Sequence, residues 1–310
     1  MKSFHQIKAI IWAVDPFQDK ASAKRVAGWV AAAAKTFQAK VHVVFASPMA
    51  ALPVSGKAKA AVEHPYLAEA AANLEIFAEF TGLKGVSTEV LVKHPRRELS
   101  PEEMILSKAK ELGVGLIVVA THARGLLGRL LVGSFAESLL AKSQIPLFVV
   151  SPHSKAQAPS VLRNLLVPTD LSNHSADVCG EAAKLAIKHK MTLILEHAFI
   201  NEFVPVLQAD AFVMGDLAAL DGKALKESLQ AQETLMASWV AKIKKSGAKV
   251  SGRLITKPGL VSDLIVASAK READFVLMST HRAASAYDLL GSVTKKVLRA
   301  SPVPVMTVKD

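Results

Sequence analysis

The sequence of 310 residues predicts an α/β protein made of two similar domains, each a parallel sheet flanked by helices, and three observations carry this prediction. The first is an internal repeat. Residues Ser279–Val308 follow the layout of Ala120–Val150, namely a strand end, Thr-His, a loop, Gly-Ser, a helix, proline and a last strand. Because the period is about half the chain, the repeat indicates a duplicated domain and not a solenoid.

The second observation is that five apolar, strand-like runs alternate with four helical patterns in each half, which is typical of parallel sheets with helices on both faces. The third is the length, which suits two domains of ordinary size. We place these domains at 1–152 and 161–310. The polar, proline-containing segment Ser151–Ser160 is the expected linker between them.

Each element of the first half follows from a local pattern. Continuous apolar runs predict buried parallel strands. Alanine-rich Ala21–Thr36 predicts the first helix, and Pro65–Phe80, with proline in its first turn, the second. Ser100-Pro101-Glu102-Glu103 is a capping box that opens the third helix. The expected strands are Ile7–Val14, Val41–Phe45, Thr88–Val92, Leu116–Ala120 and Leu147–Val150.

The second half repeats this order. A helix over Ala176–Lys188 follows the capping candidates Ser172 and Asn173. Apolar residues at helical spacing predict an amphipathic helix over Lys223–Lys245. The expected strands are Leu162–Pro168, Leu193–Leu195, Val250–Ile255, Phe275–Ser279 and Val305–Val308.

Two segments are expected to be loops, Ser47–Ala60 and Asn201–Asp221. The second contains many apolar side chains between Phe203 and Met214, which we expect to cover a pocket or to pack against the other half. The last strands of the two halves would each leave an exposed apolar sheet edge. Mutual pairing of these strands would remove both edges.

The composition argues against several classes of function and location. The formal net charge is +11, but the lysines are scattered along amphipathic helices, so we expect affinity for small anions rather than nucleic acid. No apolar run reaches the length of about 18 residues that a membrane span needs. The N-terminus lacks the pattern of a signal peptide, and the single Cys179 cannot form an internal disulfide. We therefore expect a cytoplasmic protein without membrane contact. The ten histidines show no metal-ligand spacing.

Ligands of open parallel sheets bind beyond the carboxyl ends of the strands, at the point where the strand order reverses. Three features of each half converge there: an aspartate that ends the first strand, the loop after the fourth strand, and a Gly-Ser pair that opens the last helix. A helix N-terminus suits phosphate, and a carboxylate can bind ribose hydroxyls. The same residues also occur as ordinary helix caps and turn residues. They are Asp15, Ala120, Thr121, Gly133 and Ser134 in the first half, and Asp170, Ser279, Thr280, Gly291 and Ser292 in the second.

Together, these motifs resemble the universal stress protein family. The resemblance covers nearly the whole chain in two copies and rests on LLVPTD at 165–170, GSVTKKV at 291–297 and PVPV at 302–305. It implies Rossmann-like, adenine nucleotide alpha hydrolase-like domains that form a pseudo-dimer inside one chain, with higher homo-oligomers left open. It also implies a role in stress tolerance as a sensor or adaptor for a protein partner that the sequence does not identify. ATP or AMP is the implied ligand, and magnesium accompanying the nucleotide is the only implied metal.

The chain departs from the family's phosphate loop, which has the form G-x-x-G, nine residues, then G-S/T. Ala120 and Ala123 replace the glycines of the first half, and Ser279 and Arg282 replace those of the second, where the spacer is one residue shorter. A side chain at a left-handed glycine position costs about 1–2 kcal/mol. Arg282 either binds phosphate directly or lies in solvent.

Three functions therefore remain open: a nucleotide-binding sensor, a scaffold with degenerate sites, and a weak ATPase. No nucleophile and base pair is recognisable in the sequence, so no catalytic residue is predicted.

Overall fold

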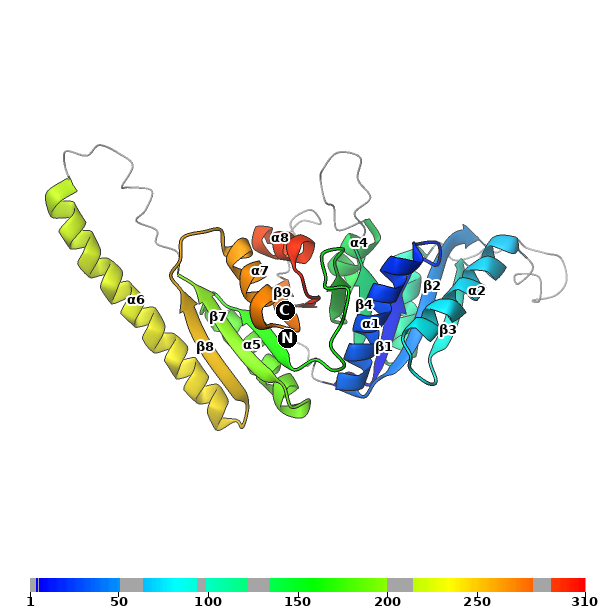
Figure 1. Cartoon of the computed structure of the whole chain (residues 1–310), viewed down its shortest axis with the longest axis horizontal. Coiled ribbons are helices and arrows are strands. Elements are labelled where there is room, and N and C mark those ends of the chain that lie inside the picture. Colours follow the sequence, from blue (N-terminus) through cyan, green and yellow to red (C-terminus); the bar gives the residue numbers. More distant parts are fainter. Residues whose placement is uncertain are drawn as a thin grey trace.

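The computed structural model describes residue 4 and residues 6–50, 64–93, 99–121, 134–199, 214–280 and 291–309. Strands and helices alternate throughout (Figure 1). The first half contains β1 (Ala9–Ala13), α1 (Lys20–Phe37), β2 (Lys40–Ala50), α2 (Pro65–Phe80), β3 (Ser87–Lys93), α3 (Pro101–Glu111), β4 (Leu116–Ala120), α4 (Ser134–Lys142) and β5 (Leu147–Val150). The second contains β6 (Asn164–Pro168), α5 (Asn173–Lys188), β7 (Thr192–Ala198), α6 (Met214–Lys245), β8 (Lys249–Ile255), α7 (Val261–Glu272), β9 (Phe275–Thr280), α8 (Ser292–Ala300) and β10 (Val305–Lys309).

Local signals explain where the helices begin. Asp19 caps α1 by accepting a hydrogen bond from Ser22 N, and Ser172 caps α5 in the same way through Ser175 N. At α3, the backbone N–H of Ser100 donates to the Glu103 carboxylate (3.0 Å), as the capping-box sequence predicts. Side-chain caps of this kind typically stabilise a helix by about 1 kcal/mol.

The ten strands form one sheet, in the order β3-β2-β1-β4-β5-β10-β9-β6-β7-β8. Every pair within a half is parallel, whereas β5 and β10 pair antiparallel, with Met306 opposite Phe148. The expected pairing of the two last strands is thus confirmed. Across the intervening β10, the rings of Phe148 and Phe275 lie 5.9 Å apart, so one aromatic pair joins the cores of the two halves.

Helices cover both faces of each half. In the first half, α1 contacts α2 and α3 contacts α4. Since crossovers between parallel strands are right-handed, the two pairs lie on opposite faces of the sheet. The linker is docked on both halves. Trp29 Nε1 donates to the carbonyl oxygen of Lys155 (3.1 Å), and Lys155 N donates to that of Pro302 (2.9 Å).

Two expectations about loops were wrong in part. β2 continues to Ala50, because a bulge between Ala46 and Ala50 lets the strand keep its pairing with β3. The helix expected from Lys223 begins earlier, at Met214, since the added residues include alanine, leucine and methionine, which favour helices. The remaining loop residues, 51–63 and 201–213, lie outside the described residues, and so does the prediction that the segment from Phe203 covers a pocket.

Candidate functional site

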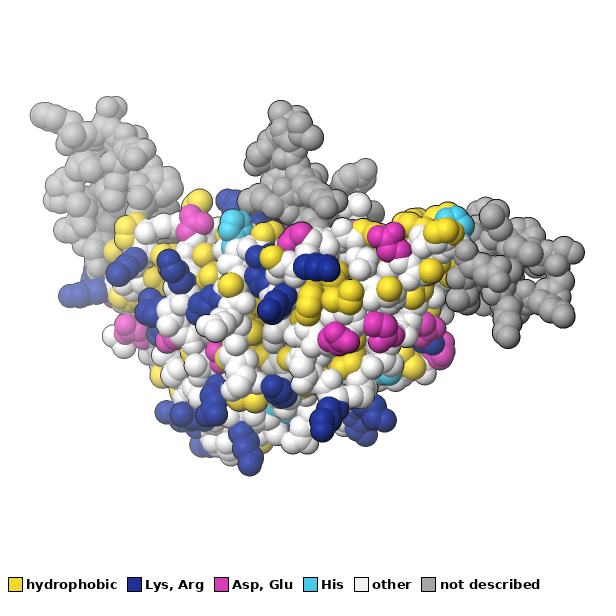
Figure 2. All heavy atoms as spheres, turned by 45° about the vertical axis from the view of Figure 1, so that its right-hand side comes forward, with side chains coloured by type: hydrophobic (Ala, Val, Ile, Leu, Met, Phe, Trp, Pro, Cys, Tyr) yellow, Lys and Arg dark blue, Asp and Glu magenta, His cyan; other side chains and the backbone are white. Residues whose placement is uncertain are grey.

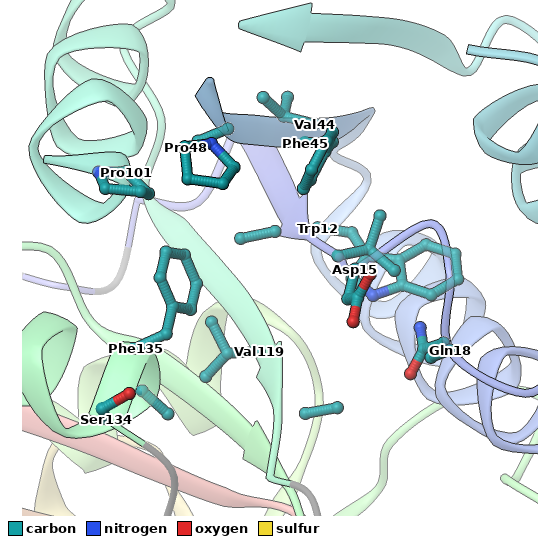
Figure 3. Close-up of a pocket in the computed structure, with 15 residues that line it drawn as sticks. Trp12, Asp15, Gln18, Val44, Phe45, Pro48, Pro101, Val119, Ser134 and Phe135 are labelled. Atoms are coloured by element: carbon teal, nitrogen blue, oxygen red, sulfur yellow. The ribbon is translucent and has the colours of Figure 1, made fainter. Parts of the chain in front are cut away.

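A cavity of about 340 Å³ lies at the carboxyl ends of β1, β2 and β4, next to the start of α4 (Figure 3). Three of the predicted site residues line it, namely Asp15, Ala120 and Ser134. The sheet order places it where β1 adjoins β4, the point at which the direction of the crossovers reverses. Its volume falls within the range of about 300–1,000 Å³ that is usual for small-molecule sites.

The wall of the cavity is mainly apolar. Val44 and Phe45 come from β2 and Phe135 from α4 (Figure 3). Phe45 belongs to an aromatic cluster in which the ring of Phe17 stacks on that of Tyr66, with centroids 4.7 Å apart. Burial and the negative charge of Asp15 raise the pKa of Tyr66, which keeps its hydroxyl protonated. Of this cluster, Phe45 lines the cavity and places an aromatic ring on the same wall as the Asp15 carboxylate.

Two residues of this wall, Trp12 and Gln18, also carry buried polar atoms. The indole Nε1 of Trp12 and both amide atoms of Gln18 have no hydrogen-bond partner among the described residues. Trp12 is fully buried, and Gln18 is 6% exposed. A buried polar group without a partner costs about 1–3 kcal/mol, so these atoms favour a polar molecule in the cavity. The sequence did not identify either residue.

Asp15 retains hydrogen-bonding capacity. Its Oδ1 accepts one hydrogen bond, from Phe17 N (2.9 Å), as in an ordinary turn after a strand. Figure 3 places this carboxylate and the Ser134 hydroxyl on opposite sides of the cavity. The arrangement suits a ligand with hydroxyl groups at one end and an anionic group at the other.

The other predicted residues of the first half are not part of this wall. Thr121 lines a neighbouring cavity on the α1 side of β4. Ala123 and Gly133 lie outside the described residues, as does Arg282 of the second half, so the effect of the replaced glycines stays a prediction.

In the second half, Asp170 occupies the position of Asp15 but accepts more hydrogen bonds. Its Oδ1 accepts hydrogen bonds from Ser172 N (2.9 Å) and from Ser175 Oγ (2.5 Å). Burial alone would raise the pKa of Asp170, but these hydrogen bonds outweigh it and lower the pKa to about 2. Ser279 and Thr280 end β9, and Gly291 and Ser292 open α8, as expected.

A buried ionic network stands where the first half has its apolar wall. The strand registers match Val44 of β2 with Glu196 of β7, since these residues lie opposite Ala13 and Pro168. Glu196 is 2% exposed, and its Oε2 accepts a hydrogen bond from Arg253 Nε (2.7 Å).

Further polar contacts extend from this ion pair to α7 and α6. Arg253 also pairs with Glu272 at the end of α7. His197, at the position of Phe45, is hydrogen-bonded to the Thr169 carbonyl and to Gln232 of α6. The strand ends of the two halves therefore differ in polarity although the fold is duplicated.

Burial raises the pKa of the Cys179 thiol to about 12, so this side chain packs as a neutral core residue of α5. In the part of the chain that the structure describes, no group of three or more His, Cys, Asp or Glu side chains could hold a metal ion. Within the same residues, no helix is both long and apolar enough to span a bilayer. On the face shown in Figure 2, basic side chains are dispersed, with acidic ones between them.

Two parallel five-stranded units, joined at their last strands and carrying a crevice at the strand ends, define a tandem α/β protein of the Rossmann-like class. The model of the universal stress protein family matches residues 6–151 and 162–309, and the chain belongs to this family. The resemblance noted from the sequence motifs is thus confirmed.

Solved structures agree on the fold. The chain is similar to a protein of unknown function from Pseudomonas aeruginosa PAO1 (TM-score 0.61, 17% identity, 99% of this chain and 94% of the other covered). It is also similar to a universal stress protein from Archaeoglobus fulgidus (TM-score 0.59, 17% identity, 99% and 98% covered). No curated protein matches the sequence.

Proposed function

We propose that the chain is a stress-response sensor or adaptor that binds an adenine nucleotide, AMP or ATP, in the first-half cavity. The observation that carries this proposal is the combination, at the reversal point of the sheet, of the Asp15 carboxylate with the unpartnered polar atoms of Trp12 and Gln18. The carboxylate would accept ribose hydroxyls, and the apolar wall would contact the base. Ser134 and the N-terminus of α4 would bind phosphate.

We further propose that the second half does not bind the nucleotide. Glu196 places a buried carboxylate where Val44 lines the first cavity. Together with its partner Arg253, this carboxylate replaces the apolar surface that would contact the base. Asp170 is held by two serine hydrogen bonds that a ribose would have to displace.

Nucleotide binding is expected to raise the melting temperature of the protein. A ligand present at 100 times its dissociation constant stabilises the folded state by about 2.7 kcal/mol. We expect Asp15→Asn to weaken binding of AMP about tenfold, because a charged acceptor becomes a neutral amide. The matched variant, Asp170→Asn, should bind as the wild type does. Thermal-shift titration with AMP and ATP measures both.

Equal losses of AMP affinity in the two variants would mean either that both halves bind the nucleotide or that it binds at neither aspartate. A flat titration up to millimolar nucleotide would contradict the proposal and favour the scaffold function.

A further inference from the structure

A second cavity, of about 230 Å³, adjoins the first on the α1 side of β4. Gln18 and Ala120 line both cavities, so the two meet at these residues. The polar side chains that line the second cavity are Gln18, Asp19, Ser22, Arg25, Thr121 and Ser151. Of this group, only Thr121 belongs to the sequence motifs described above.

Some of these side chains already have partners. The Asp19 carboxylate accepts a hydrogen bond from Ser22 N (2.8 Å) and so caps α1. Ser151 Oγ donates to the carbonyl oxygen of Ser301 (2.8 Å). Arg25 Nη2 donates to Ser22 Oγ (3.2 Å).

Other polar atoms of the lining are buried without a partner among the described residues. They are Arg25 Nε and both amide atoms of Gln18. Whichever way the Gln18 amide is oriented, it leaves one N–H donor group and one oxygen acceptor unsatisfied. The cavity thus offers donors from two residues and at least one acceptor, and most buried polar groups in proteins do find partners.

The duplicated fold does not require these residues. The loop before α1 spans residues 14–19, whereas the loop before α5 spans only 169–172, so Gln18 has no counterpart in the second half. When the helix caps Asp19 and Ser172 are aligned, Arg25 corresponds to Val178. The second half therefore builds a shorter loop, and its helix α5 carries an apolar side chain at the position of Arg25. The polar pair is particular to the first half, which points to a ligand and not to the fold.

We propose that this second cavity binds a protonated phosphate group. Its oxygens would accept hydrogen bonds from Arg25 Nε and from the Gln18 amide, and guanidinium–phosphate pairs are among the strongest polar contacts in proteins. The P–OH group supplies the donor that the Gln18 oxygen needs. Sulfate has the same shape but carries no proton at neutral pH, so it leaves this acceptor unsatisfied.

Isothermal titration of the full chain with inorganic phosphate and with sulfate, each without nucleotide, tests this site. Phosphate should bind at least about tenfold more tightly than sulfate. Gln18→Leu and Arg25→Gln should each weaken phosphate binding about tenfold, which corresponds to one lost hydrogen bond to a charged group. Gln18→Leu should leave the unliganded protein at least as stable as the wild type, because it removes a buried polar group without a partner.

Arg163→Gln serves as the control, since it removes the same charge at an exposed position and should leave phosphate affinity unchanged. Equal binding of phosphate and sulfate, unchanged affinity in both cavity variants, or no phosphate binding at millimolar concentration would overturn the proposal. Because these titrations contain no nucleotide, their outcome does not depend on the proposed nucleotide site.

Two further titrations distinguish the source of the phosphate group. If it belongs to a nucleotide in the adjoining cavity, phosphate competes with AMP, and Gln18→Leu weakens AMP much more than adenosine. If it is free phosphate, adenosine and phosphate bind at the same time. Either result supports the second cavity as a phosphate site.

Discussion

Arg253→Met is expected to lower the free energy of unfolding by about 3–5 kcal/mol, because it leaves the Glu196 carboxylate buried without a cationic partner. Glu196 is almost fully buried, and its Oε1 already lacks a hydrogen-bond partner among the described residues. Glu272 loses less, since Arg271 also lies 3.0 Å from its Oε1. Chemical denaturation of the variant and the wild type measures the difference.

The double variant Glu196→Val with Arg253→Met is the control. Replacing both partners of a buried ion pair by apolar residues is often neutral, and the first half already carries valine, Val44, at this position. We expect its stability to lie within about 1 kcal/mol of the wild type.

A loss below about 1 kcal/mol in the single variant, or an equal loss in the single and double variants, would show that Glu196 does not need Arg253.

Phe148→Ala is expected to cost about 3–5 kcal/mol, the usual range for removing a fully buried phenyl ring. Phe148 lies on β5 beside β10, and its ring packs against that of Phe275 on β9. Its removal should therefore weaken the junction between the halves as well as the core.

The matched variant is Phe77→Ala, which removes a buried ring inside the first half. Both variants should lose similar stability. Only Phe148→Ala should separate the unfolding of the two halves into two transitions, visible as a broader melting curve and a smaller denaturant slope. A single sharp transition in both variants would mean that the aromatic pair does not couple the halves.

Much of the fold could be predicted from the sequence because its signals are local. α2, β4 and β5 have the predicted bounds, since proline, apolar runs and polar turns mark their ends. The pairing of β5 with β10 followed from the exposure that each apolar strand would otherwise have. The beginning of α6 was missed because it depends on helix propensity without a recognisable capping residue.

The site could be predicted only in part. Asp15, Ala120 and Ser134 line one cavity because parallel strands bring their carboxyl ends to the same edge of the sheet. Gln18 and Trp12 carry no motif, and their importance follows from burial, which depends on contacts distant in the sequence. The pair of Glu196 and Arg253 spans two strands and has no local signal either.

The number of nucleotides bound by one chain tests the account most directly. Native mass spectrometry of the protein with saturating AMP should show a single bound nucleotide, because the strand ends of the first half combine the Asp15 carboxylate with an apolar wall and those of the second half contain a buried glutamate. The single adduct should need about tenfold more AMP in Asp15→Asn and should be unchanged in Asp170→Asn. Two nucleotides per chain, or one that depends on Asp170, would contradict the account.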